Sequence, residues 1–165
     1  LRADTTSAFY SHLLIEEERI LSVRTGSPSW FPIFISSTPL SNICYFEIEY
    51  VNAGNNALMI GITTLANKNK VNSCNSNGSV FMYMRTGQQF INSVHFYDTS
   101  RAHPGVNDAR LQMRIDLLSN KVEWIQVHPT YYPIGAVTIP ESISEQDLYP
   151  CIEFNPTFNG RIRLM

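Results

Sequence analysis

The segment from Ile43 to Leu65 constrains the fold of this chain more than any other stretch. From Cys44 to Tyr50 (CYFEIEY), apolar residues alternate with more polar ones. An apolar residue at every second position is typical of a β-strand with one buried and one solvated face. Residues 52–56 (NAGNN) tolerate left-handed backbone, which predicts a chain reversal, and residues 58–62 (LMIGI) predict a return strand. We therefore predict a β-hairpin at the centre of an antiparallel sheet.

Short strand patterns recur along the rest of the chain, with turn residues between them. Residues 110–117 alternate most clearly, and Ser119-Asn120 turns the chain into residues 121–127, KVEWIQV, whose Trp124 is expected in the core. The further strand predictions are residues 30–36, 79–84, 89–91, 135–139, 149–154 and 161–164, with one helical turn at most in residues 141–147. Many short strands without a long helix predict an all-β fold, an antiparallel two-sheet β-sandwich. We expect one domain over residues 1–165, with residues 1–11 as a loose N-terminal segment.

Two segments need a choice. Residues 13–23 (LLIEEERILSV) have the propensity of a helix, but their apolar residues gather at both ends without forming a stripe. We predict two short strands around a charged turn. Pro32 removes a ladder donor from its strand, which favours a position at a sheet edge or a strand start. Residues 66–78 (ANKNKVNSCNSNG) are the most polar stretch and predict a long exposed loop.

Composition limits the classes of partner. The chain of 165 residues carries 16% charged residues and a net charge of -2, without a basic run, which argues against nucleic acid as a partner. No apolar segment reaches the about 20 residues needed to span a bilayer, so we expect no membrane partner. Three widely spaced cysteines, Cys44, Cys74 and Cys151, match neither a zinc pattern nor a disulfide framework. Free thiols favour an intracellular location, in the cytoplasm or nucleus.

Several segments together resemble the SPRY family. Residues 44–49 (CYFEIE), followed by Met59-Ile60-Gly61-Ile62, are similar to its "YFEVxI…xGIG" core. Residues 111–124 resemble its second hairpin, and residues 148–154 (LYPCIEF) resemble its closing "LYPxVxL" strand. The resemblance extends over nearly the whole chain. It implies a concanavalin-like jelly-roll sandwich that binds a peptide or a protein through its loops, as part of a larger scaffold or ubiquitin-ligase adaptor, and as a monomer when isolated.

Aromatic and arginine side chains near loops are the types enriched at binding hot spots. Prolines at both ends of residues 129–133 favour a loop there, so its two tyrosines are the strongest candidates. For Trp30, packing in the core is an equal alternative. We predict a partner-binding surface from the loop residues Arg24, Trp30, Tyr97, Arg101, Tyr131 and Tyr132.

Catalysis has little support in the sequence. No nucleophile with a base is evident, and we expect neither an enzyme nor a cofactor. His95, Asp98, His103 and Asp108 match no metal-ligand spacing, so we expect solvated loop residues and no metal site. Glu47 and Glu49 predict a solvated pair on the outer face of a strand.

A carbohydrate-binding sandwich of legume-lectin or galectin type is the alternative function. Polar loops and the glycosylation sequon at Asn77 allow it, but no acidic calcium-binding loop is visible.

Overall fold

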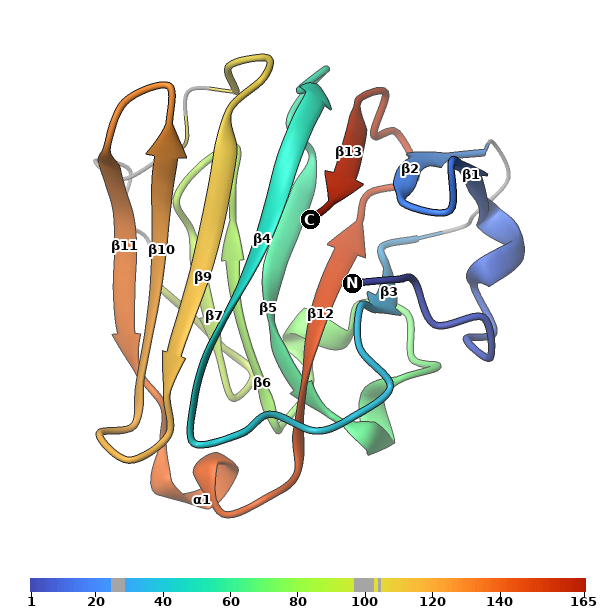
Figure 1. Ribbon diagram of the computed structural model, residues 1–165. Coiled ribbons are helices and arrows are strands. Elements are labelled where there is room, and N and C mark those ends of the chain that lie inside the picture. The colour runs from blue at the N-terminus through green and yellow to red at the C-terminus, as the bar shows by residue number, and fades with distance from the viewer. Residues whose placement is uncertain (25–28, 97–102, 104) are drawn as a thin grey trace.

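The computed structural model is a sandwich of two antiparallel sheets (Figure 1). It describes residues 1–24, 29–96, 103 and 105–165. In the seven-stranded sheet the order is β1-β2-β13-β4-β9-β10-β11, and in the six-stranded sheet it is β3-β12-β5-β6-β7-β8. The seven-stranded sheet contains β1 (Leu13–Glu16), β2 (Ile20–Val23), β4 (Ile43–Asn52), β9 (Arg110–Asp116), β10 (Lys121–His128), β11 (Tyr132–Thr138) and β13 (Arg161–Leu164). The six-stranded sheet contains β3 (Phe31–Phe34), β5 (Leu58–Thr64), β6 (Ser79–Tyr83), β7 (Gln89–Ile91), β8 (Val94–Phe96) and β12 (Leu148–Phe154). The two-sheet all-β fold predicted from the sequence is confirmed.

The predicted central hairpin is wrong, because β4 and β5 lie in different sheets. β4 pairs with β9 and β13, whereas β5 pairs with β6 and β12. The physical reason is burial. Every residue of β5 is buried, so it needs a central position covered on both faces, whereas β4 keeps one partly solvated face. Residues 53–57 therefore carry the chain from one sheet to the other, with positive φ at Gly54 and Asn56.

The main core fills the space between the sheets. Trp124 of β10 lies there with an exposed fraction of 1%, and its indole N–H donates to the Ile60 carbonyl of the opposite sheet at 3.0 Å. Leu111, Met113 and Ile115 of β9 face the same core, as their alternation predicted. The β9–β10 hairpin forms with Lys121 opposite Asp116, which confirms the predicted turn at Ser119-Asn120.

Two local choices made from the sequence are confirmed. Residues 13–16 and 20–23 are paired strands and not a helix. β3, which contains Pro32, is an edge strand that pairs with β12 alone among the described strands. A single turn of helix, α1 (Glu141–Ser144), precedes β12. Three 3-10 turns complete the regular elements of the described residues: η1 (Tyr10–His12), η2 (Leu65–Asn67) and η3 (Ser73–Asn75).

Residues 66–78 are not the wholly exposed loop that their polarity predicted. They lie over the outer face of the six-stranded sheet, where Cys74 packs with Phe34, Phe81 and Cys151 in a second apolar cluster. Asn67 and Ser73 are buried as well. Asn67 can be buried here because its side chain bonds to the sheet and to its own segment: the amide donates to Thr63 Oγ1 and to the Asn77 carbonyl, both at 2.9 Å.

Two further segments make contacts that their sequences did not predict. Of residues 128–133, expected as a loop, His128 ends β10 and Tyr132-Pro133 begin β11. Pro133 is tolerated because β11 is at the edge of its sheet. In the N-terminal segment, Ala3 is buried and the Asp4 amide donates to the Phe34 carbonyl at 2.8 Å.

Candidate functional site

One end of the sandwich is built from loops that bond to one another. The antiparallel registers bring together the C-terminal ends of β4 and β10 and the N-terminal ends of β5, β9, β11 and β13 at this end, which is uppermost in Figure 1. We call it the loop end and define it by residues 52–57, 103–109, 128–131 and 155–160. It omits residue 104, which lies outside the described residues.

The turn at residues 52–57 is the centre of the loop end. Its Asn55 amide donates to Asn159 Oδ1 at 2.7 Å, and its Asn55 side chain donates to the Thr157 carbonyl at 2.9 Å. On the other side, the Ala53 amide donates to Asn107 Oδ1 at 2.9 Å. Side-chain amides can donate and accept, so this asparagine-rich turn fixes the loops on both sides of it.

A buried polar network lies beneath the loop end. The Tyr50 hydroxyl bonds to Asn56 Oδ1, and the Asn56 amide donates to the His103 carbonyl at 3.3 Å. The His103 ring lies 5.2 Å from the Tyr50 ring. Burial raises the pKa of Tyr50 and lowers the pKa of His103, so both are neutral near pH 7.

His103 continues the network to the loop between β10 and β11. Its Nδ1 accepts from the Gly105 amide at 3.0 Å, so Nε2 carries the proton of the neutral ring. Nε2 therefore donates to Gln126 Oε1, 2.8 Å away. The Gln126 amide in turn donates to the Thr130 carbonyl at 2.9 Å. A chain of three bonds thus joins the loop that precedes β9 to the loop that contains Tyr131.

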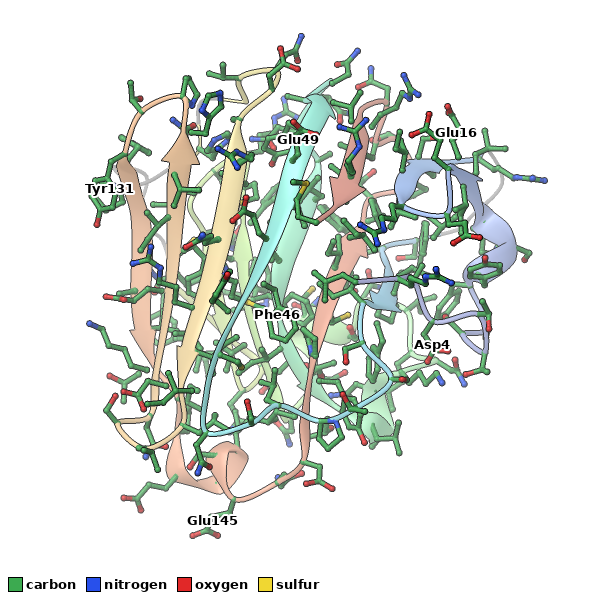
Figure 2. All side chains as sticks on the ribbon, in the orientation of Figure 1. Asp4, Glu16, Phe46, Glu49, Tyr131 and Glu145 are labelled. Atoms are coloured by element: carbon green, nitrogen blue, oxygen red, sulfur yellow. The ribbon has the colours of Figure 1, made fainter. Side chains whose placement is uncertain are left out.

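The surface of the loop end carries an exposed tyrosine, an exposed aliphatic residue and exposed side-chain amides. Tyr131 is 68% exposed and points away from the sandwich (Figure 2), and Val106 is 41% exposed. Asn107 is exposed next to Val106 in the chain, and Asn52 is exposed at the end of β4, three strands away from β11. An exposed aromatic side chain and amide groups at the same end of the molecule suit an extended peptide, whose backbone needs both donors and acceptors.

The residues predicted from the sequence to bind a partner do not form one cluster. Arg24 is exposed just beyond β2, and Tyr131 lies just before β11, at the opposite edge of the same sheet. Five strand spacings separate β2 from β11, about 24 Å at about 4.8 Å each. Tyr132 is half-buried and packs against the main core. Tyr97 and Arg101 lie outside the described residues.

Trp30 has a different environment from the loop end. It is half-buried beside the second apolar cluster, and its ring meets Tyr83 edge-on at a centroid distance of 5.2 Å. Its carbonyl accepts from the Asn72 amide at 2.9 Å, so it helps to hold residues 66–78 on the six-stranded sheet.

The network residues His103, Gln126 and Asn56 are absent from the sites predicted from the sequence. His103 was expected to be solvated, but its exposed fraction is 3%, because residues 103–109 fold back over Tyr50. For Gln126 the sequence contains one local indication of a buried polar site. Gln126 is a polar residue inside an otherwise apolar strand segment, and a buried amide there needs partners.

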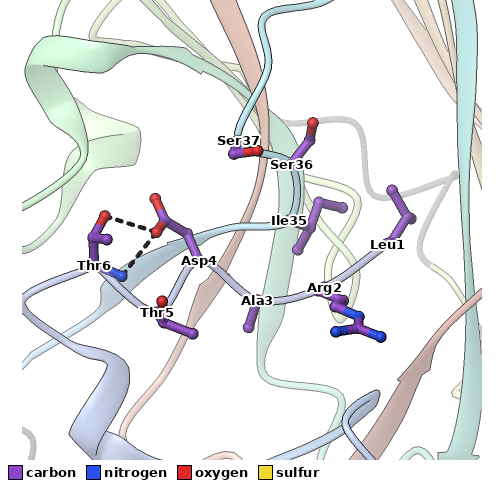
Figure 3. Close-up of a pocket in the computed structure, with 9 residues that line it drawn as sticks. All are labelled: Leu1, Arg2, Ala3, Asp4, Thr5, Thr6, Ile35, Ser36 and Ser37. Atoms are coloured by element: carbon purple, nitrogen blue, oxygen red, sulfur yellow. Dashed lines mark hydrogen bonds between the residues drawn. The ribbon is translucent and has the colours of Figure 1, made fainter.

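A cavity of about 530 Å³ lies away from the loop end, between the N-terminal segment and residues 35–37 (Figure 3). Its titratable side chains already have partners. Asp4 accepts from the Thr6 amide and hydroxyl and pairs with Lys68 at 2.6 Å, and Arg2 pairs with Glu18 at 2.8 Å. These charges are thus engaged in structural contacts.

Glu47 and Glu49 were expected to be a solvated pair, but both carboxylates have partners in the structure. Glu47 accepts from the Gln112 amide at 2.8 Å, and Glu49 pairs with Arg163. These pairs form part of a polar ladder on the outer face of the seven-stranded sheet, where β9 and β13 flank β4. Among the described residues, no group of three histidine, cysteine or acidic side chains is arranged to hold a metal ion.

Comparison with solved structures identifies the architecture. The TRIM65 PSpry domain superposes with a TM-score of 0.69 at 17% identity, covering 100% of this chain and 91% of that chain. The SPRY domain of human HERC1 gives 0.67 at 15% identity, covering 92% and 91%, and a human SPRY domain gives 0.65 at 18%, covering 93% and 94%. The chain has the SPRY fold.

The segments that carry the SPRY resemblance in the sequence are strands of this fold. They form β4, β5, the β9–β10 hairpin and β12. The resemblance predicted from these segments is therefore confirmed at the level of the fold. No model of a protein family matches the sequence, and no curated protein matches it. In the described part of the chain, no helix has the length and apolar character needed to cross a membrane.

Proposed function

We propose that this chain is a non-catalytic interaction module that binds a short peptide or a segment of a partner protein at the loop end. The observation that carries the proposal is the combination at that end of interlocked loops and exposed Tyr131. The turn at residues 52–57 is bonded to the loops on both sides, so the surface is formed before a partner arrives. A pre-formed surface loses little conformational entropy on binding, which favours affinity for a short ligand.

The chemistry of this surface favours an uncharged, extended ligand. Its exposed described side chains include three amides, with Tyr131 and Val106 for apolar contact and Asp108 as a carboxylate; the others are Pro129, Thr130, Thr157 and His128. Tyrosine supplies a large contact area with little side-chain entropy to lose. The partner segment would place an apolar side chain on Tyr131 and bond its backbone to the asparagines. We further propose that the module works inside a larger intracellular scaffold or ubiquitin-ligase adaptor.

The test is selection from a displayed peptide library, with Tyr131→Ala as the test variant. Tyr45→Ala is the matched control, because Tyr45 is 63% exposed on the outer face of the seven-stranded sheet, far from the loop end. Removing a central aromatic from an interface costs at least about 2 kcal/mol, or about 30-fold in Kd. We expect selected peptides to lose that affinity for Tyr131→Ala and to keep it for Tyr45→Ala, with both variants melting like the wild type.

Three outcomes would contradict the proposal. Peptides that lose affinity for Tyr45→Ala alone would move the site to the sheet face. A library that yields no peptide above background would remove the short-peptide function. Retention on a glycan array, released by free sugar, would favour the carbohydrate-binding alternative.

A further inference from the structure

We propose that His103 and Gln126 are positioning residues for the binding surface, and that the neutral imidazole is the form that holds the Tyr131 loop in place. The inference deepens the proposed function, on which it rests for its biological meaning. It assigns regulation by protons to the loop end, with the bond from Gln126 to the Thr130 carbonyl as the point of control.

The geometry requires one protonation state. His103 Nδ1 faces the Gly105 N–H at 3.0 Å and can only accept that bond without a proton of its own. A second ring proton would be placed on Nδ1, where it would face another donor. The bond to Gly105 would be lost, and the loop at residues 103–109 would have to move.

Gln126 transmits the state of the imidazole. Its Oε1 accepts from His103 Nε2, which leaves its amide group directed at Thr130, with the carbonyl at 2.9 Å and Oγ1 at 3.4 Å. Gln126 is 3% exposed, so water cannot readily replace either partner. Displacement of His103 therefore removes the bond that orients the Gln126 amide. The Gln126 amide then no longer bonds to the carbonyl of Thr130, the residue before Tyr131.

The surroundings give the protonated ring no compensation. Tyr50 is the titratable side chain in ring contact with His103, and its hydroxyl is engaged with Asn56. Gln126 from β10 is uncharged. Burial lowers the pKa of His103, the bond to Gln126 opposes this, and no charged side chain of the described residues contributes. The released loop would return the ring to water, where its pKa is about 6.5.

The direction of the pH effect follows from this difference. A lowered pKa in the anchored state means that the released state binds more protons, so anchoring is complete above about pH 6.5 and weakens as the pH falls. Below that value the ratio of anchored to released loop decreases by up to about tenfold per pH unit, until the imidazole also protonates in the anchored state.

Hydrogen exchange of the backbone tests the anchor without any ligand. We would compare amide protection of residues 127–132 at about pH 7.5 and about pH 5.5, corrected for the intrinsic exchange rate. The turn at residues 119–120, at the other end of the sandwich, is the internal reference. We expect protection of residues 127–132 to fall several-fold at the lower pH, while the reference is unchanged.

Two histidine variants assign the effect. His103→Gln removes the titration and can still donate to Gln126, so its protection should be equal at both pH values. His12→Gln removes a histidine of η1, outside the loop end and outside the measured segment, and should behave like the wild type. Protection that does not change with pH in the wild type, or the same fall in His103→Gln as in the wild type, would overturn the proposal.

A measurement on the wild type alone tests the proposal even if His103→Gln does not fold. In the wild type, the imidazole resonances of His103 and the loss of protection in residues 127–132 should follow the same pH midpoint, and separate midpoints would overturn the anchor. Peptide affinity at the two pH values is measured separately. Absence of any bound peptide would refute the proposed function. The exchange data alone decide whether neutral His103 holds the Tyr131 loop in place.

Discussion

Glu153 lies at the interface between β12 and the segment that covers the six-stranded sheet. It is fully buried, and its Oε2 accepts from the Cys74 amide at 2.9 Å, while Oε1 has no partner among the described residues. Burial raises the pKa of Glu153 to about 7. A shifted carboxyl can indicate catalysis, but this one is sealed from solvent beneath Ser73 and Cys74. Its consequence is therefore for stability.

The pH dependence of this residue has a defined sign. The folded protein keeps a proton on Glu153 up to about pH 7, whereas the unfolded chain releases it near its ordinary value of 4.5. The folded state thus binds more protons between these values, and stability falls as the pH rises through that window. The difference between a pKa of about 7 in the folded protein and 4.5 in the unfolded chain corresponds to about 3 kcal/mol.

Glu153→Gln should remove the loss of stability at higher pH, because the glutamine side-chain oxygen can still accept from the Cys74 amide without carrying a charge. We expect the variant to gain about 3 kcal/mol over the wild type between about pH 4.5 and about pH 8, as measured by urea unfolding with reductant present. Glu145→Gln, an exposed change beyond α1 (Figure 2), is the control. The same pH dependence in the wild type and Glu153→Gln would show that the carboxyl does not titrate in this window.

At the scale of the element, β5 shows how tightly neighbouring strands pack. A Cβ at Gly61 would lie 2.1 Å from the Val80 carbonyl oxygen and 2.8 Å from Phe81 Cα, both backbone atoms of β6. A Cβ at Gly135 on β11 would lie 2.4 Å from Met82 Cε, the mobile end of a side chain. The two glycines thus differ in the nature of the obstacle, which is backbone at Gly61 and the end of a side chain at Gly135.

Gly61→Ala should destabilise the protein by about 3 kcal/mol or more, because a backbone strand must move. Gly135→Ala should cost about 1 kcal/mol, because the methionine can rotate away. Denaturant unfolding of both variants measures the difference. Equal losses would mean that the β5–β6 pair shifts more easily than its backbone contacts indicate.

At the scale of the whole molecule, two separate apolar layers give the sandwich its shape. The main core lies between the sheets, and the second cluster lies outside the six-stranded sheet beneath residues 66–78. Each layer contains one tryptophan. Trp124 is fully enclosed between the sheets, whereas Trp30 is half-buried beside the outer cluster.

Trp124→Phe should therefore cost much more than Trp30→Phe. It leaves a cavity between the sheets and removes the donor to the Ile60 carbonyl, together about 3 kcal/mol. Trp30→Phe keeps an aromatic ring near Tyr83 at a partly solvated site, with an expected loss of about 1 kcal/mol. Unfolding followed by far-ultraviolet circular dichroism measures both, and a larger loss for Trp30→Phe would place the main stability in the outer layer.

The amino-acid sequence by itself determined most of the strands and the inward faces of β4 and β9, but it did not predict β8. The alternation in β4 and β9, the turn at Ser119-Asn120 and the edge position of Pro32 are local properties of neighbouring residues, so they can be recognised without knowing what packs on them. The order of these patterns also carried the SPRY resemblance, which the fold confirms.

Only the tertiary structure decided which strands pair and which polar residues are buried. The split of β4 and β5 between two sheets depends on what covers the outer face of β5, and that cover comes from residues 66–78. His103 and Gln126 are 23 positions apart and become partners only when the loop before β9 folds over Tyr50. Strand formation follows from local periodicity, whereas pairing and polar burial depend on contacts between residues distant in the chain.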